Sequence, residues 1–119
     1  MNKRVLIVDD SKTEVEIAAA MLKNQGYLID SAYNGKEALI LIEKKKFDII
    51  LLDIVMPEMD GYTFLRELRS RNIDIPVVMI TQKKENDMKG LFSIDKYTSY
   101  LEKPFKEDTL LSAVKSILG

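Results

Sequence analysis

Short runs of apolar residues alternate with longer amphipathic stretches five times along the chain. The first run, residues 5–8, is continuous and rich in β-branched side chains, which is typical of a strand buried on both faces. Further strands are predicted at residues 28–33, 49–52, 77–80 and 99–102. The second of the five has mixed polarity, and this favours a place near the edge of a sheet.

The stretches between these runs predict helices. Ser11 and Asn34 each stand three residues before a glutamate, the spacing of a capping box in which the two residues exchange hydrogen bonds at a helix start. Asp60 precedes a third helix, and apolar residues at helical spacing predict a last one that includes residues 110–118. A further helix is expected near residues 85–95.

Five strand–helix units with such apolar strands require a parallel sheet covered by helices on both faces and joined by right-handed crossovers. The predicted fold is therefore a doubly wound α/β domain over residues 1–119. In such sheets ligands bind beyond the carboxyl ends of the strands. Four strands end there in polar residues, namely Asp9 with Asp10, Asp53, Thr81 and Lys103. We expect these residues to form one site.

Composition limits the chemistry of this site. The chain has no cysteine and no histidine, which excludes disulfides, thiolate metal sites, a cysteine nucleophile and an imidazole base. A net charge of −1 without a long basic run argues against nucleic-acid binding. No apolar stretch approaches the roughly 20 residues that cross a bilayer, and the run before Asp9 is too short for a signal peptide. A cytoplasmic domain is expected.

Three carboxylates and one ammonium group would leave the site with a net negative charge. Oxygen ligands alone suit a hard cation such as Mg²⁺, which takes one or two carboxylates together with water and phosphate oxygens. Asp53 could then act as a nucleophile and accept a phosphoryl group as an acyl phosphate. Lys103 and the hydroxyl of Thr81 would stabilise the phosphoryl oxygens.

Asp53 favours a functional role because a carboxylate at a buried strand end needs a partner, but the other residues also have a purely structural interpretation. Asp9 and Asp10 could cap the following helix, and Thr81 could be a hydrogen-bonded hydroxyl at a strand end. Lys103 could be a solvated surface charge, and Tyr100 an aromatic residue that favours a strand. Their joint placement at the strand ends favours the functional interpretation.

Short motifs stand at residues 5–10, 34–39, 53–61, 80–81 and 100–105. With these motifs the whole chain resembles the CheY-like receiver domains of two-component response regulators. The resemblance implies a flavodoxin-like (βα)5 fold with strand order 2-1-3-4-5.

The resemblance also implies a phosphoacceptor site. Asp9, Asp10 and Asp53 would bind Mg²⁺, together with the backbone carbonyl of Val55. Asp53 would accept a phosphoryl group from a histidine kinase or a phosphotransfer protein. The domain would be a signalling protein that assists its own phosphorylation and dephosphorylation, not an enzyme acting on a separate substrate.

Thr81 and Tyr100 would form a switch pair, and the peptide bond between Lys103 and Pro104 would be cis. Phosphorylation would remodel the surface of the fourth helix, fifth strand and fifth helix. That surface would bind a downstream effector protein or domain, or a second copy in a homodimer. Direct binding to nucleic acid or to a membrane is not expected.

Other functions fit the sequence less well. Gln82 stands where the family usually has a small residue, which keeps open a phosphorylation-independent pseudo-receiver that acts as an interaction module. An aspartate-nucleophile phosphatase would show Asp-x-Asp after the first strand, whereas Ser11 stands at its last position. A flavin or nucleotide carrier would need a Gly/Ser/Thr-rich loop there. The sequence fits a stand-alone regulator and the N-terminal domain of a longer one equally well.

Overall fold

The computed structural model describes residues 2–54, 60–81 and 97–119, and its five strands form a single parallel sheet. The strands are β1 (Arg4–Val8), β2 (Leu28–Ala32), β3 (Ile49–Asp53), β4 (Val77–Thr81) and β5 (Thr98–Glu102). Their order across the sheet is β2-β1-β3-β4-β5. The five predicted strands and the strand order implied by the resemblance are both confirmed.

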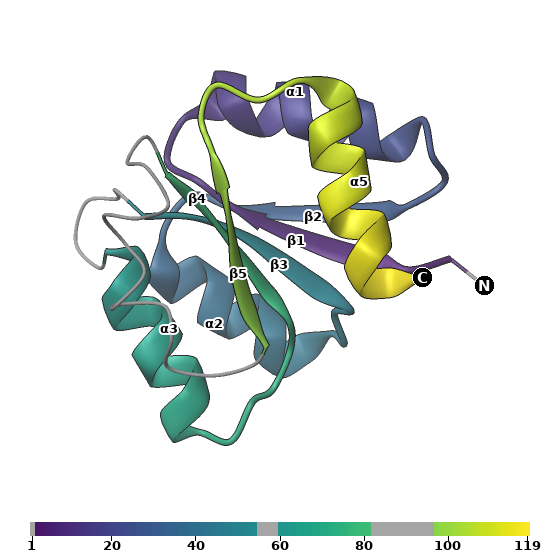
Figure 1. Ribbon diagram of the computed structural model, residues 1–119. Coiled ribbons are helices and arrows are strands. Elements are labelled where there is room, and N and C mark those ends of the chain that lie inside the picture. Colours follow the sequence, from purple (N-terminus) through teal and green to yellow (C-terminus); the bar gives the residue numbers. More distant parts are fainter. Residues whose placement is uncertain (1, 55–59, 82–96) are drawn as a thin grey trace.

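Helices cover both faces of the sheet. The described helices are α1 (Lys12–Lys23), α2 (Gly35–Lys44), α3 (Gly61–Ser70) and α5 (Glu107–Leu118). Figure 1 shows α1 and α5 on one face and α2 and α3 on the other. The helix expected near residues 85–95 lies outside the described residues.

Burial follows the apolar runs. Every residue of β3 and β4 is buried, and so is β1 after Arg4, because helices pack on both faces of these strands. Phe64, Leu65 and Leu68 of α3 join the core on one face, and residues of α1 and α5, such as Leu22, join the other. Strand β2 is only partly buried and lies at the edge, as its mixed polarity predicts.

Helix α2 begins with the predicted cap. The Asn34 side chain accepts a hydrogen bond of 2.9 Å from the Glu37 N–H. The Glu37 carboxylate reaches back and accepts from the N–H of Tyr33 at 3.0 Å and from the Asn34 side-chain amide at 3.4 Å. The side chains of Asn34 and Glu37 therefore accept hydrogen bonds from N–H groups at the helix start, which have no partner within the helix.

At the start of α1, only one of the two hydrogen bonds of the predicted capping box is present. The Ser11 hydroxyl accepts from the Glu14 N–H at 3.3 Å, as a cap should. The Ser11 N–H, however, donates to the Asp9 carboxylate at 2.9 Å, not to Glu14. The box is incomplete because Asp9, two residues before Ser11, accepts the hydrogen bond that the glutamate would accept. The Glu14 carboxylate is left available for another partner.

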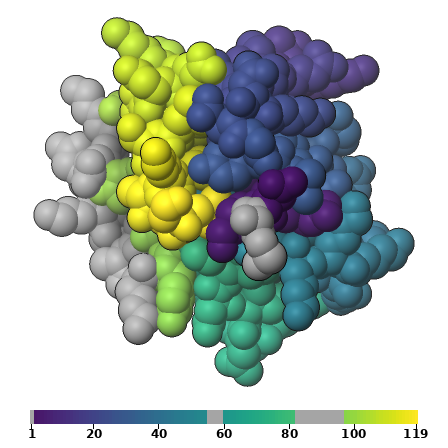
Figure 2. Space-filling model, turned by 90° about the vertical axis from the view of Figure 1, so that its right-hand side faces the viewer, coloured from purple at the N-terminus to yellow at the C-terminus, as the bar shows by residue number. Residues whose placement is uncertain are grey.

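The chain ends lie on the side of the molecule where β1 begins (Figure 1). Figure 2 views that side and shows the end of α5 beside the first residues of the chain. Both ends are therefore remote from the edge at which β1 stops. Within the described ranges, no helix has the length and apolar character needed to cross a membrane.

Candidate functional site

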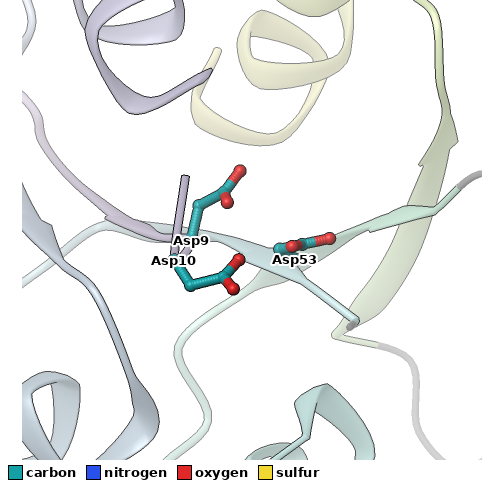
Figure 3. Close-up of side chains that lie close together, drawn as sticks. All are labelled: Asp9, Asp10 and Asp53. Carbon is teal, nitrogen blue, oxygen red and sulfur yellow. The ribbon is translucent and has the colours of Figure 1, made fainter. Parts of the chain in front are cut away.

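Three carboxylates meet at the carboxyl edge of two neighbouring strands. Asp9 and Asp10 follow β1, and Asp53 is the last residue of β3, which pairs with β1. One carboxylate oxygen of each lies within 4.8 Å of those of the other two. Figure 3 shows the three side chains at this edge. The structure thus brings together residues that are far apart in sequence, as their strand-end positions predict.

Asp9 is a carboxylate of this cluster whose pKa is clearly raised. Its side chain is buried, with an exposed fraction of 6%. Burial raises its pKa to about 7, against the opposing effect of the hydrogen bond from the Ser11 N–H. The negative charges of Asp53 and Glu14 contribute to this increase, while the ammonium group of Lys103 opposes it. The carboxylates therefore repel one another in the absence of a cation.

Lys103 supplies the positive charge of the site. It follows β5, and its ammonium nitrogen lies 3.5 Å from Oδ1 of Asp53 and 2.9 Å from Oε1 of Glu14. Burial alone would lower the pKa of Lys103. The Glu14 hydrogen bond and the charges of Asp53, Asp9 and Glu14 outweigh burial and raise that pKa. Lys103 therefore stays charged beside Asp53, and its peptide bond to Pro104 is cis.

Thr81 and Tyr100 lie on β4 and β5, the last two strands of the chain. Thr81 is buried at the end of β4, and its carbonyl accepts a hydrogen bond of 2.6 Å from the Lys103 N–H. Tyr100 pairs with Met79, which stands two residues before Thr81. Since side chains alternate along a strand, Thr81 and Tyr100 project from the same face of the sheet. Tyr100 is partly buried against the core on that face.

The backbone at Asp53 is held by a close approach from α3. The Gly61 N–H donates to the Ile54 carbonyl at 2.8 Å. A Cβ atom at position 61 would lie 2.8 Å from the Ile54 Cα and 2.9 Å from the Asp53 carbonyl oxygen. Only glycine fits against the chain at this point, so Gly61 helps to fix where the Asp53 backbone lies.

The donor set fits a hard divalent cation. Its ligands are carboxylate oxygens only, they converge within 4.8 Å, and one of them has a pKa raised by burial and by its neighbours' charge. A cation of charge +2 relieves this repulsion, and oxygen donors are those that Mg²⁺ prefers. The expected fourth ligand, the carbonyl of Val55, lies outside the described residues.

A hollow beside the carboxylates is a feature that the sequence did not predict. It has a volume of about 490 Å³, and it lies between α1 and the segment that follows β5. Ile17, Met21 and Phe105 give it an apolar lining, and Glu14 and Lys103 line it as well. Its one signal in the sequence is Ile17, an apolar residue outside the buried stripe of α1 that is 51% exposed.

The family described as the response regulator receiver domain matches residues 5–115. The chain belongs to this family. Receiver domains are signalling domains that interact with histidine kinases and effectors, and they generally depend on Mg²⁺. The resemblance seen in the sequence motifs is thereby confirmed.

Individual relatives support the same assignment. Protein PilH of Pseudomonas aeruginosa is 37% identical over 118 residues, which cover 98% of each protein. The alkaline phosphatase synthesis transcriptional regulatory protein PhoP of Bacillus subtilis is 36% identical over 118 residues, 99% of this chain but 49% of PhoP. This receiver domain thus matches nearly all of PilH and about half of PhoP.

Solved receiver structures share the fold. Chemotaxis protein CheY4 of Vibrio cholerae has a TM-score of 0.91 and 31% sequence identity, with 98% of this chain and 99% of that chain covered. The receiver domain of the Francisella response regulator 1452 has a TM-score of 0.86 and 36% identity, with 98% and 96% covered. The CheY-like, flavodoxin-like architecture is therefore confirmed as well.

Proposed function

We propose that this receiver domain accepts a phosphoryl group on Asp53 from a histidine kinase or a phosphotransfer protein. The observation that carries the proposal is a buried carboxylate at a strand end with a charged ammonium group 3.5 Å away. An oxygen of Asp53 forms the new bond to phosphorus while the bond from phosphorus to the donor breaks. The product is an acyl phosphate.

Two further carboxylates give Asp53 the surroundings that this reaction needs. Asp9, Asp10 and Asp53 would hold Mg²⁺, which when bound offsets carboxylate charge and favours an incoming phosphoryl group. Ligation by the Val55 carbonyl stays a prediction. Asp53 would supply both an oxygen ligand to the metal and the nucleophilic oxygen, so its replacement should abolish the reaction.

Lys103 and Thr81 would hold the phosphoryl group once it is attached. The Lys103 ammonium group already lies near Asp53, so a short movement brings it to the new phosphoryl oxygens. The attached phosphoryl group adds negative charge and strong acceptor atoms, which draw in the ammonium group and the Thr81 hydroxyl. The Lys103 N–H and the Thr81 carbonyl are already hydrogen-bonded, so these two residues would respond together.

The switch would pass from Thr81 to Tyr100 on the shared face of β4 and β5. An inward shift of Thr81 gives Tyr100 room to turn toward the interior, and this changes the surface that β5 and α5 present. That surface would bind a downstream effector protein or domain, or a second copy of the chain. No direct binding to nucleic acid or to a membrane is proposed, and a cytoplasmic location stays a prediction.

The alternative, a pseudo-receiver that works without phosphorylation, is less well supported. A module used only for binding has no need of three convergent carboxylates beside a partly buried, charged lysine, because two of these carboxylates are buried and their burial opposes their charge. The three carboxylates and the lysine all belong to the described residues.

The proposal is tested by incubating the protein with acetyl phosphate and Mg²⁺ and measuring its intact mass. Wild-type protein should gain one phosphoryl group, and Asp53→Asn should gain none because the amide is a poor nucleophile. Circular dichroism establishes that the variant is folded. Labelling that persists in folded Asp53→Asn would overturn the assignment of Asp53.

Thr81→Ala should separate phosphorylation from switching. The nucleophile is untouched, so the variant should gain a phosphoryl group to at least half the wild-type extent. Without the hydroxyl, however, NMR spectra should show a much smaller response of residues 97–103 to Mg²⁺ with beryllofluoride. A control variant is Thr63→Ala, an exposed threonine of α3. A response in Thr81→Ala as large as in wild type would exclude Thr81 from the switch.

A further inference from the structure

The Lys103 ammonium group has two carboxylate partners at unequal distances. Its nitrogen lies 2.9 Å from Oε1 of Glu14 and 3.5 Å from Oδ1 of Asp53. The first distance is that of a charge-assisted hydrogen bond, and the second is longer than such a bond. Lys103 is therefore held more closely by a residue of α1 than by the carboxylate that it is proposed to assist.

Helix capping does not account for the position of Glu14. At α2 the corresponding Glu37 turns back over the helix start and accepts hydrogen bonds there. At α1 the Ser11 N–H is bonded to Asp9, and the Glu14 side chain extends to Lys103. The contact joins the first turn of α1 to the segment after β5, residues that are 89 positions apart.

We propose that Glu14 is a positioning residue that holds Lys103 in the unmodified protein and competes with the phosphoryl group for it. The inference rests on the proposed phosphorylation of Asp53. A phosphoryl group on Asp53 would draw the Lys103 ammonium group toward itself and away from Glu14, which lies closer to it in the unmodified protein. Glu14 thereby lowers the affinity of the site for an anion such as a phosphoryl group.

Loss of Glu14 should release Lys103 toward the site, not into solvent. The Lys103 side chain is only 15% exposed, and the charges of Asp53 and Asp9 also attract it. The Glu14 side chain is 43% exposed and can be replaced without opening the core. Removal of the competing carboxylate should therefore strengthen, not weaken, the interaction of Lys103 with a phosphoryl group.

The test uses two variants of Glu14 and a matched control. Glu14→Gln keeps the shape and removes the charge, whereas Glu14→Asp keeps the charge and shortens the side chain so that it no longer reaches Lys103. Glu16→Gln is the control, since Glu16 is exposed on the same helix and its replacement changes the net charge equally. The dissociation constant of beryllofluoride in the presence of Mg²⁺ is measured by NMR titration, and the initial rate of phosphorylation is measured with subsaturating acetyl phosphate.

Both Glu14 variants should bind beryllofluoride about two- to fivefold more tightly than wild type, the range expected for a partly exposed ion pair. Both should also be phosphorylated faster, while Glu16→Gln should match wild type. Glu14→Gln that matches the control, or Glu14→Asp that matches wild type, would overturn the inference and leave the proposed function standing. Wild-type protein that binds no beryllofluoride and gains no phosphoryl group would instead overturn the proposed function, and this inference with it.

Discussion

Asp9→Asn should be more stable than the wild-type protein at pH 8 in a buffer without divalent cations. Burial raises the pKa of the Asp9 carboxyl to about 7, with a further contribution from the charges of Asp53 and Glu14. At pH 8 the Asp9 carboxylate of the folded wild type is therefore negatively charged, although its buried surroundings disfavour this charge. Asparagine removes that charge and keeps an oxygen that accepts from the Ser11 N–H. The free energy of unfolding in urea should rise by on the order of 1 to 3 kcal/mol.

The advantage of this variant should depend on pH in a defined way. The unfolded chain has the ordinary aspartate pKa of 3.8, so the folded state binds this proton more tightly than the unfolded state does. The resulting stability is fully present below about pH 4 and is lost as the pH rises through about 7. The difference between Asp9→Asn and wild type should therefore grow from pH 4 to pH 7 and stay constant above it.

A control variant and the addition of Mg²⁺ test whether the effect is specific to the carboxylate cluster. Asp74→Asn removes an exposed carboxylate outside the cluster and should show no such pH-dependent gain. Addition of Mg²⁺ at pH 8 should stabilise the wild type far more than Asp9→Asn, because a bound ligand stabilises only the state that can hold it. A stability difference between Asp9→Asn and wild type that is the same at pH 4 and pH 8 would contradict the account of Asp9.

Gly61→Ala should damage both stability and phosphorylation. The added methyl group would lie 2.8 Å from the Ile54 Cα and 2.9 Å from the Asp53 carbonyl oxygen, so backbone must move to admit it. Such overpacking typically lowers the free energy of unfolding by about 1 to 3 kcal/mol. Because the displaced backbone belongs to the proposed nucleophile, phosphorylation by acetyl phosphate should slow by about tenfold or more.

Thr63→Ala is the matched control for this substitution. It likewise introduces alanine in the first turn of α3, but at an exposed position that already carries a Cβ atom. Urea denaturation should show little change in its stability, and its phosphorylation rate should stay near that of wild type. If Gly61→Ala behaved like Thr63→Ala, the close approach at position 61 would not constrain the Asp53 backbone.

The fold and the carboxylate cluster could be predicted because strong local signals determine them. Continuous apolar runs that end in Asp9 or Asp53 indicate strands buried on both faces, and parallel strands place their carboxyl ends on one edge. The order of the strands is different in kind. The sequence of a strand does not show which strand it pairs with. The strand order is therefore predicted by the resemblance to a known family and not by hydrophobic periodicity.

The partner of Glu14 could not be predicted, because two interactions compete for the same side chain. The spacing Ser11-x-x-Glu14 satisfies the pattern of a capping box, and nothing local shows that Asp9 will take the Ser11 N–H first. Lys103, 89 positions away, is brought to Glu14 by the tertiary fold, in which β5 pairs with β4. The hollow lined by Ile17 and Phe105 is likewise formed by elements from opposite ends of the chain.

The most direct test of the central claim is to locate the phosphoryl group chemically. Wild-type protein is phosphorylated with acetyl phosphate and Mg²⁺, treated with borohydride to reduce the acyl phosphate to an alcohol, digested, and sequenced by mass spectrometry. An aspartate that carried the phosphoryl group is thereby converted to homoserine. The account predicts homoserine at position 53 and unchanged aspartate at positions 9 and 10. Homoserine at position 9 or 10, or none at position 53 in protein that gained the phosphoryl mass, would contradict it.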